Sequence, residues 1–102
     1  HAAYLAALVE QNPYLELTAP LSMSITCFRM IQPGWEEKAL QELNKEILLR
    51  LQEEGIASPS STILNGKYTL RVANTNQRTR SEDMELLVRE VLRLGKSIIA
   101  GG

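Results

Sequence analysis

The sequence predicts a single small α+β domain in which two long helices cover one face of a small antiparallel sheet. Three observations predict it. The pair Asn65-Gly66 separates two runs with strand character, an alternating segment covers residues 22–30, and helical patterns cover 35–54 and about 80–94. The order is helix, strand, helix, strand, strand, helix, which fits a sheet with helices on one side and an uncovered second face.

Residues 2–11 favour a helix that is apolar on nearly every side, and Asn12-Pro13 ends it because the residue before a proline is pushed out of the α region. A surface helix shows one apolar stripe. A chain of 102 residues builds only one modest core. We therefore expect this helix to pack on another domain or subunit.

Residues 14–18 can form a short extended piece, and 22–30 predict the first strand. Apolar residues alternate with polar ones as far as Cys27, and then the phase breaks because Phe28 and Met30 are both apolar. Either a bulge lies near Cys27 or the end of the strand is buried on both faces. Cys27 is expected to be a buried small hydrophobe rather than a nucleophile.

The strongest helix pattern runs over 35–54. One face carries the apolar residues at helical spacing: Trp35, Ala39, Leu40, Leu43, Ile47, Leu48 and Leu51. Glu36 and Glu37 fall in the first turn, where carboxylates suit the helix dipole. Gly55 is placed as the left-handed stop residue, with Ile56 able to contact Leu51.

A two-residue Asn-Gly turn fixes the register of the hairpin that follows. The expected opposed pairs are Leu64 with Lys67, Ile63 with Tyr68, Thr62 with Thr69, Ser61 with Leu70, and Ser60 with Arg71. One face is then apolar, with Ile63, Tyr68, Leu70 and Val72 beside Ser61. The other face is polar and rich in hydroxyl groups, and its one charged residue in this reading is Arg71.

In the last helix, over about 80–94, Thr79 is expected at the N-cap and Glu82 three residues later. Its apolar stripe consists of Met84, Leu87, Val88, Val91 and Leu92. Gly95 is expected to end or interrupt the helix, and residues 98–102 to fray.

Composition excludes several classes of function. The net charge is −1 with mixed signs, so there is no basic field for nucleic acid or for an anionic membrane, and no apolar run is long enough to span a bilayer. Cys27 is the single cysteine and favours a reducing compartment, hence the cytoplasm. The chain has no glycine-rich phosphate-binding motif, no CxxC pair and a single histidine, His1. We therefore expect no metal site, no cofactor-binding residue and no catalytic residue in the chain itself.

Arg71 is the candidate substrate-binding residue. A guanidinium in mid-strand that is partly desolvated needs an anion, and its planar fork suits a carboxylate. The alternative is a strand arginine that reaches water or pairs with a structural carboxylate. Arg29 is interpreted as structural, and Arg78 and Arg80 as solvated loop charges.

Several short runs resemble the C-terminal end of the group II pyridoxal-phosphate decarboxylases, a family that includes aromatic amino acid, glutamate and diaminobutyrate decarboxylases. These runs are NGKYTLRVAN over 65–74, NQRTR over 76–80, DMELLV over 83–88, and upstream matches at 15–20, 27–29 and 43–55. The resemblance covers essentially the whole chain.

The resemblance implies that the chain is the small C-terminal domain of a fold-type I pyridoxal-phosphate enzyme and is inactive alone. In that family the cofactor-binding lysine and aspartate belong to a large domain, and an arginine matching Arg71 lies near the substrate carboxylate. Residues 1–12 would be a linker helix packed on the missing large domain, and 13–102 the small domain. A homodimer is expected for the parent enzyme, with an amino acid as substrate.

Other readings stay open at this point. The same α+β order suits a free-standing ferredoxin-like binding or regulatory module. Aminotransferases and cysteine desulfurases have a similar small domain, so the reaction type is less firmly implied than the cofactor. A catalytically inactive relative that is used only for dimer contacts is a further possibility.

Overall fold

The computed structural model describes residues 2–20, 25–55, 59–73 and 81–101. Along the chain the elements are α1 (Ala2–Glu10), β1 (Leu15–Leu17), β2 (Ile25–Met30), α2 (Glu37–Glu54), β3 (Ser60–Leu64), β4 (Lys67–Ala73) and α3 (Ser81–Ile99). The predicted α+β class and the order of the elements are confirmed, and the expected extended piece at 14–18 becomes the edge strand β1.

The four strands form one antiparallel sheet in the order β1-β2-β4-β3. The hairpin register is the predicted one, from Leu64 opposite Lys67 to Ser60 opposite Arg71. Asn65 and Gly66 both have positive φ, 51° and 77°, as a two-residue turn of this kind requires. The central strand β4 is therefore held on both sides, by β2 and by β3.

β2 resolves the break in the hydrophobic phase that the sequence left open. Its pairing runs without interruption, from Ile25 opposite Ala73 to Phe28 opposite Leu70, so the strand has no bulge there. The side chains of Thr26 to Met30 are all buried, although they alternate between the two faces of the sheet. The second alternative, a strand end buried on both faces, is correct.

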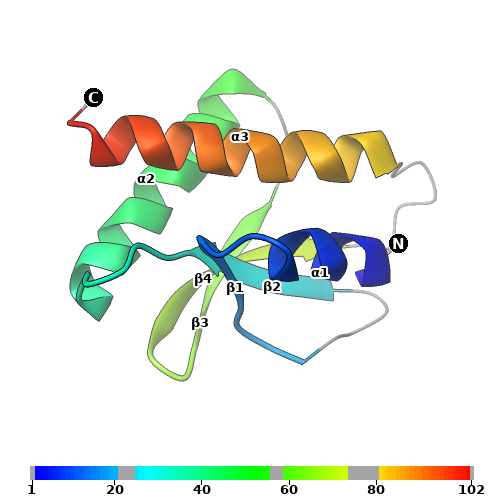
Figure 1. The fold of residues 1–102 in the computed structure, drawn as a ribbon, viewed down its shortest axis with the longest axis horizontal. Helices are drawn as coiled ribbons and strands as arrows, with labels where there is room; N and C mark the ends of the chain where they lie inside the picture. Colours follow the sequence, from blue (N-terminus) through cyan, green and yellow to red (C-terminus); the bar gives the residue numbers. More distant parts are fainter. Residues whose placement is uncertain (1, 21–24, 56–58, 74–80, 102) are drawn as a thin grey trace.

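All three helices lie on the same face of the sheet (Figure 1), and the core fills the space between. The sheet contributes Leu15, Phe28, Met30 and Leu70 to this core. The helices contribute Leu5, Val9, Leu40, Leu43, Ile47, Leu48, Leu51, Met84, Leu87, Val88, Val91 and Leu94. No helix of the described residues lies on the second face, which bears Cys27, Arg29, Ser60, Thr69 and Arg71 and is called the open face below.

Part of the apolar surface of α1 is covered within this domain. Leu5 and Val9 are fully buried against α3, β1 and β2. Tyr4 remains 37% exposed, and its hydroxyl donates a hydrogen bond to Glu85 on α3. Contact between the outer side of α1 and another domain stays a prediction.

α2 begins two residues later than predicted. Trp35 lies before the helix in a turn, where its backbone N–H bonds to Gln32 O at 3.1 Å, and its side chain is 38% exposed. The helix stops as expected at Gly55, which has φ 68° and ψ 21°. The contact predicted for Ile56 lies outside the described residues.

α3 continues through Gly95 to Ile99, so the prediction that Gly95 ends or interrupts it is wrong. Ile98 and Ile99 pack against the core rather than fraying. Close packing explains a glycine at position 95: a Cβ there would lie 2.0 Å from Met30 Sδ and 3.3 Å from Ile47 Cδ1. The predicted N-cap, Thr79, lies outside the described residues.

We expect Gly95→Ala to lower the free energy of unfolding by about 1–2 kcal/mol. Alanine gains about 1 kcal/mol in helix propensity, but its methyl group overlaps the fully packed Met30 side chain, and such overpacking typically costs more. Urea unfolding measures the change. In a Met30→Ala background, where the space is free, the same substitution should stabilise; a gain in the wild-type background would contradict the packing argument.

Candidate functional site

Arg71 occupies the middle of a row of three side chains that crosses the open face. In register, Cys27 of β2 lies on one side of Arg71 in β4 and Ser60 of β3 lies on the other. Residues that are directly opposed point to the same face. Because β4 is paired along both edges, the Cα of Arg71 has a fixed position in the sheet.

The surroundings of Arg71 are small and polar, as the sequence predicts. The expectation that Arg71 is the one charged residue of this face is wrong, because Lys67 and Arg29 also lie on it. Thr62 and Thr69 form the next opposed pair on the open face. Thr69 is fully buried and donates its hydroxyl to Lys67 O at 3.2 Å, whereas the Arg71 and Ser60 side chains are exposed. Arg71 therefore extends from a packed strand into solvent.

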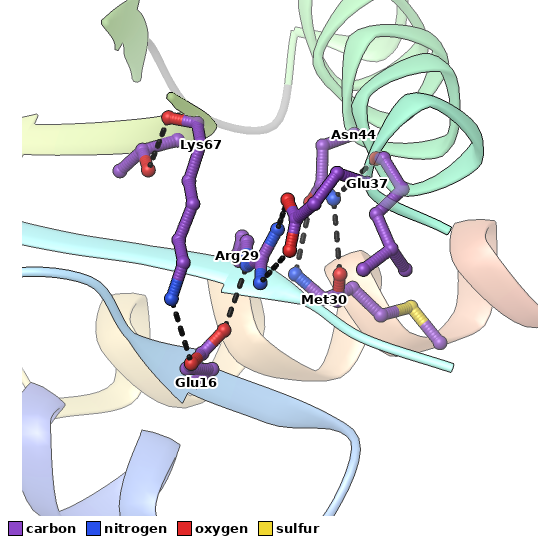
Figure 2. Close-up of polar contacts among 8 residues, drawn as sticks. Glu16, Arg29, Met30, Glu37, Asn44 and Lys67 are labelled. Carbon is purple, nitrogen blue, oxygen red and sulfur yellow. Dashed lines mark hydrogen bonds and ion pairs between the residues drawn. The ribbon is translucent and has the colours of Figure 1, made fainter. Parts of the chain in front are cut away.

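A second set of charges lies farther along the same strands (Figure 2). Arg29 donates from Nε to Glu16 at 2.7 Å and makes two bonds to Glu37, at 2.7 and 3.1 Å. Lys67 Nζ lies 3.5 Å from the other oxygen of Glu16. This charge cluster of Glu16, Arg29, Glu37 and Lys67 joins β1, β2 and β4 to the start of α2, so Arg29 has the structural role that was predicted for it.

Arg71 differs from these cations because no carboxylate among the described residues pairs with it. In the charge cluster two cations face two carboxylates, so the charges there balance. Across the described ranges, no carboxylate comes within ion-pair distance of Arg71. Its charge is therefore not matched by any carboxylate of the described residues, and an external anion can pair with it.

Cys27 lies beside Arg71 but is poorly suited to act as a nucleophile. Burial raises the pKa of the Cys27 thiol, and the positive charge of Arg71 offsets only part of that rise. The side chain is 9% exposed. The interpretation of Cys27 as a buried small hydrophobe is confirmed.

The charge cluster makes the stability of the fold depend on pH. The hydrogen bonds that Arg29 donates lower the pKa of Glu37. Burial works to lower the pKa of Arg29, but its bonds to Glu37 and Glu16 outweigh this, so that pKa is raised overall. A depressed carboxylate pKa contributes stability above its unfolded value, near pH 4.3, and that contribution disappears as the pH falls through the folded pKa.

We therefore expect Glu37→Gln to lower the melting temperature at pH 7, and the difference from wild type to shrink as the pH falls from about 5 to about 3. Glu53→Gln, an exposed substitution on the same helix, is the matched control. Thermal unfolding across that pH range measures both. A difference that stays constant with pH would contradict the assignment.

Asn44 is the site residue that the sequence reasoning missed. It lies on the apolar face of α2 and is fully buried (Figure 2). Its side-chain amide bonds to the backbone of Met30 in the way that a neighbouring strand does, beyond the end of the β2–β4 pairing. Its Oδ1 accepts from Met30 N at 2.9 Å, and its Nδ2 donates to Met30 O at 3.0 Å and to Leu40 O at 2.8 Å. The signal was present: one amide within a buried apolar stripe needs partners.

A groove of about 420 Å³ lies between α1 and α3, away from the open face. Leu8, Val88 and Leu92 line its apolar floor, and Arg89 and Lys96 are among the charged residues that line it. In the part of the chain that the structure describes, no group of His, Cys, Asp and Glu side chains is arranged to hold a metal ion. No described helix has the length and apolar character needed to cross a membrane.

Comparison with known proteins places the chain beside one group of enzymes. It is 32% identical over 91 residues to an aromatic-L-amino-acid decarboxylase of Drosophila lebanonensis, covering 89% of this chain and 21% of that protein. It is 36% identical over 66 residues to a phenylacetaldehyde synthase of Arabidopsis thaliana, covering 65% and 14%. No protein-family model matches the chain.

Solved structures show the same relationship. The glutamate decarboxylase domain of a Vibrio parahaemolyticus diaminobutyrate-pyruvate transaminase and L-2,4-diaminobutyrate decarboxylase matches with a TM-score of 0.82 and 29% identity, over 94% of this chain and 20% of that one. An Oryza sativa TDC, solved with PLP and tryptamine, has the same fold at a TM-score of 0.86 and 21% identity, over 95% and 21%.

These relatives and neighbours are group II decarboxylases that depend on pyridoxal phosphate, so the resemblance seen in the sequence is confirmed. The chain spans only about a fifth or less of the length of the relatives described above.

Proposed function

We propose that the chain is the small C-terminal domain of a pyridoxal-phosphate-dependent amino acid decarboxylase, and that its Arg71 binds the carboxylate of the substrate. The observation that carries the proposal is the unmatched charge of Arg71, on a face where the other two described cations are paired. The kinship with decarboxylases supplies the class of ligand, an amino acid.

The chemistry of Arg71 follows from its position. A guanidinium offers two parallel N–H donors to the two oxygens of a carboxylate, which fixes the orientation of the amino acid as well as holding it. The pairing of β4 on both sides limits how far this donor pair can move. If Arg71 bound the carboxylate more strongly in the substrate than in the transition state, it would stabilise the substrate and slow the decarboxylation. We therefore propose that Arg71 orients the substrate without such preferential binding.

The cofactor is expected from the rest of the enzyme. Bound pyridoxal phosphate acts as an electron sink for the carbanion left by decarboxylation. The described strand residues do not fit a cofactor site, since their one lysine, Lys67, faces Glu16. We therefore assign this domain the orientation of the substrate and no step of bond cleavage.

We further propose that a large cofactor-binding domain covers the open face. The outer side of α1, next to its groove with α3, is proposed to contact the rest of the parent enzyme. Residues 1–12 then form the linker and 13–102 the small domain. The groove has an apolar floor at Leu8, which an interdomain contact would bury. A cytoplasmic homodimer is the proposed state of the parent.

The experiment begins with the reading frame that encodes the chain. The proposal requires a preceding segment with a cofactor-binding lysine, and the protein encoded by that longer frame should release CO2 from an amino acid when pyridoxal phosphate is present. Aromatic, acidic and diamino substrates are compared, because the relatives include aromatic and diaminobutyrate enzymes. The 102-residue chain, assayed alongside, should release none.

Two outcomes would overturn the proposal. A reading frame without such a segment would favour the free-standing ferredoxin-like module. Aldehyde formation or amino-group transfer without release of free amine would keep the cofactor class but change the reaction, a possibility raised by the phenylacetaldehyde synthase among the relatives.

A further inference from the structure

β3 is an edge strand with no described element beyond it. It is the last strand in the sheet order, and α2 packs on its neighbour β4. Its five residues, Ser60–Leu64, carry no charge and no proline. Figure 1 shows the β3–β4 hairpin projecting away from α1 and α3, so the outer edge of β3 lies clear of both helices.

The register determines which backbone groups of β3 face outward. The two-residue turn makes Leu64 and Lys67 a hydrogen-bonded pair, so the bonded pairs continue at Thr62 with Thr69 and at Ser60 with Arg71. The N–H and C=O groups of Ser61 and Ile63 therefore point away from β4. These two residues flank Thr62 symmetrically.

We propose that this edge pairs with the same edge of a second copy of the chain, antiparallel and centred on Thr62. A two-fold axis through Thr62 places Ser61 of each chain opposite Ile63 of the other, and each N–H then meets a C=O. Four backbone hydrogen bonds form, and the two sheets become one continuous sheet. The inference is independent of the proposed function.

The side chains also favour a second copy as the partner. Ile63 is 64% exposed although it lies on the face that carries the helices, and it is the most exposed of the large apolar side chains described. In this arrangement each Ile63 lies beside a small Ser61 and diagonal to the other Ile63, within reach of contact. An uncharged strand causes no like-charge repulsion when it pairs with itself.

The opposite edge of the sheet lacks these properties. β1 has only three residues, with Pro13 before it and Pro20 after it, and its Glu16 is held by Arg29. Short strands, prolines and charges are the usual means by which natural sheets prevent edge pairing. Self-association is therefore expected through β3 and not through β1.

Sedimentation velocity and amide hydrogen exchange on the 102-residue chain test the proposal. The chain should dimerise reversibly, with a dissociation constant between about 1 µM and 1 mM. As the concentration rises, exchange at the Ser61 and Ile63 amides should slow, while the Thr62 amide, already bonded to β4, should be protected throughout.

Ile63→Pro removes one outward N–H without removing a bond to β4, and should weaken the dimer at least about tenfold. Ile63→Val keeps the N–H and is the matched control, with an effect below about threefold. Ile63→Lys places two like charges near the contact between the two β3 strands and replaces the proline variant if that variant fails to fold. Its weakening of the dimer should be smaller at high salt. A chain that stays monomeric at about 1 mM, or a folded Ile63→Pro or Ile63→Lys dimer of unchanged affinity, would overturn the proposal.

Discussion

In the enzyme that carries this domain, Arg71→Gln is expected to lower kcat/KM by about 100-fold to 1,000-fold. Removing one partner of a desolvated, hydrogen-bonded charge pair typically costs 2–5 kcal/mol, and each tenfold in rate corresponds to about 1.4 kcal/mol. Most of the loss should appear in KM, because Arg71 is proposed to hold a carboxylate that is already present in the bound substrate.

Two comparisons make this result specific. Affinity for the product amine, which has lost the carboxylate that Arg71 is proposed to bind, should be unchanged in Arg71→Gln. Arg71→Lys should lose less than Arg71→Gln, since it keeps the charge but not the planar pair of donors. The matched control is Arg50→Gln, which changes an arginine whose Nε pairs with Glu46 on α2, and its kinetics should be close to wild type. Equal loss of affinity for amine and amino acid would remove Arg71 from the carboxylate site.

Asn44→Leu is expected to lower the free energy of unfolding by about 2–4 kcal/mol. The substitution keeps the branched shape of the side chain but leaves the buried N–H and C=O of Met30 without their partners, each of which costs about 1–3 kcal/mol when unsatisfied. Urea unfolding measures the change, and the slope with urea concentration should stay the same.

Asn44→Asp separates the two bonds to Met30, because it can still accept from Met30 N but can no longer donate to Met30 O or Leu40 O. It should be destabilised as well, with a deficit that shrinks when the pH falls and the carboxyl group regains a proton to donate. Gln52→Leu, at an exposed position of the same helix, should change stability by less than about 0.5 kcal/mol. A fully stable Asn44→Leu would contradict the role assigned to Asn44.

Local chemistry explains why some elements could be predicted. The hairpin register follows from Asn65-Gly66, since this pair favours the two-residue type I′ turn, in which both residues have positive φ. The end of α2 follows from Gly55 for the same kind of reason. Each of these signals acts between residues close together in the chain.

Gly95 and Asn44 show where local reasoning fails. The rule that a glycine near the end of a helical pattern marks a stop is statistical, and here it is overridden because Met30, from a strand far back in the chain, packs against Gly95. The sequence reasoning assigned no role to Asn44, because its partner Met30 lies in a different element of the fold. Both residues contact Met30, which lies beyond the last described pair of β2 and β4.

The sequence by itself determined the α+β class, the register that places Arg71 on the polar face, and the resemblance to decarboxylases, because these depend on periodicity, turn residues and short motifs. Only the tertiary structure decided which cations are already paired. The sequence predicts a structural role for Arg29 but does not identify its partners, Glu16 and Glu37, which β1 and α2 bring to it. Ion pairing acts over a few ångströms between distant parts of the chain, so the unmatched charge of Arg71 became visible only after folding.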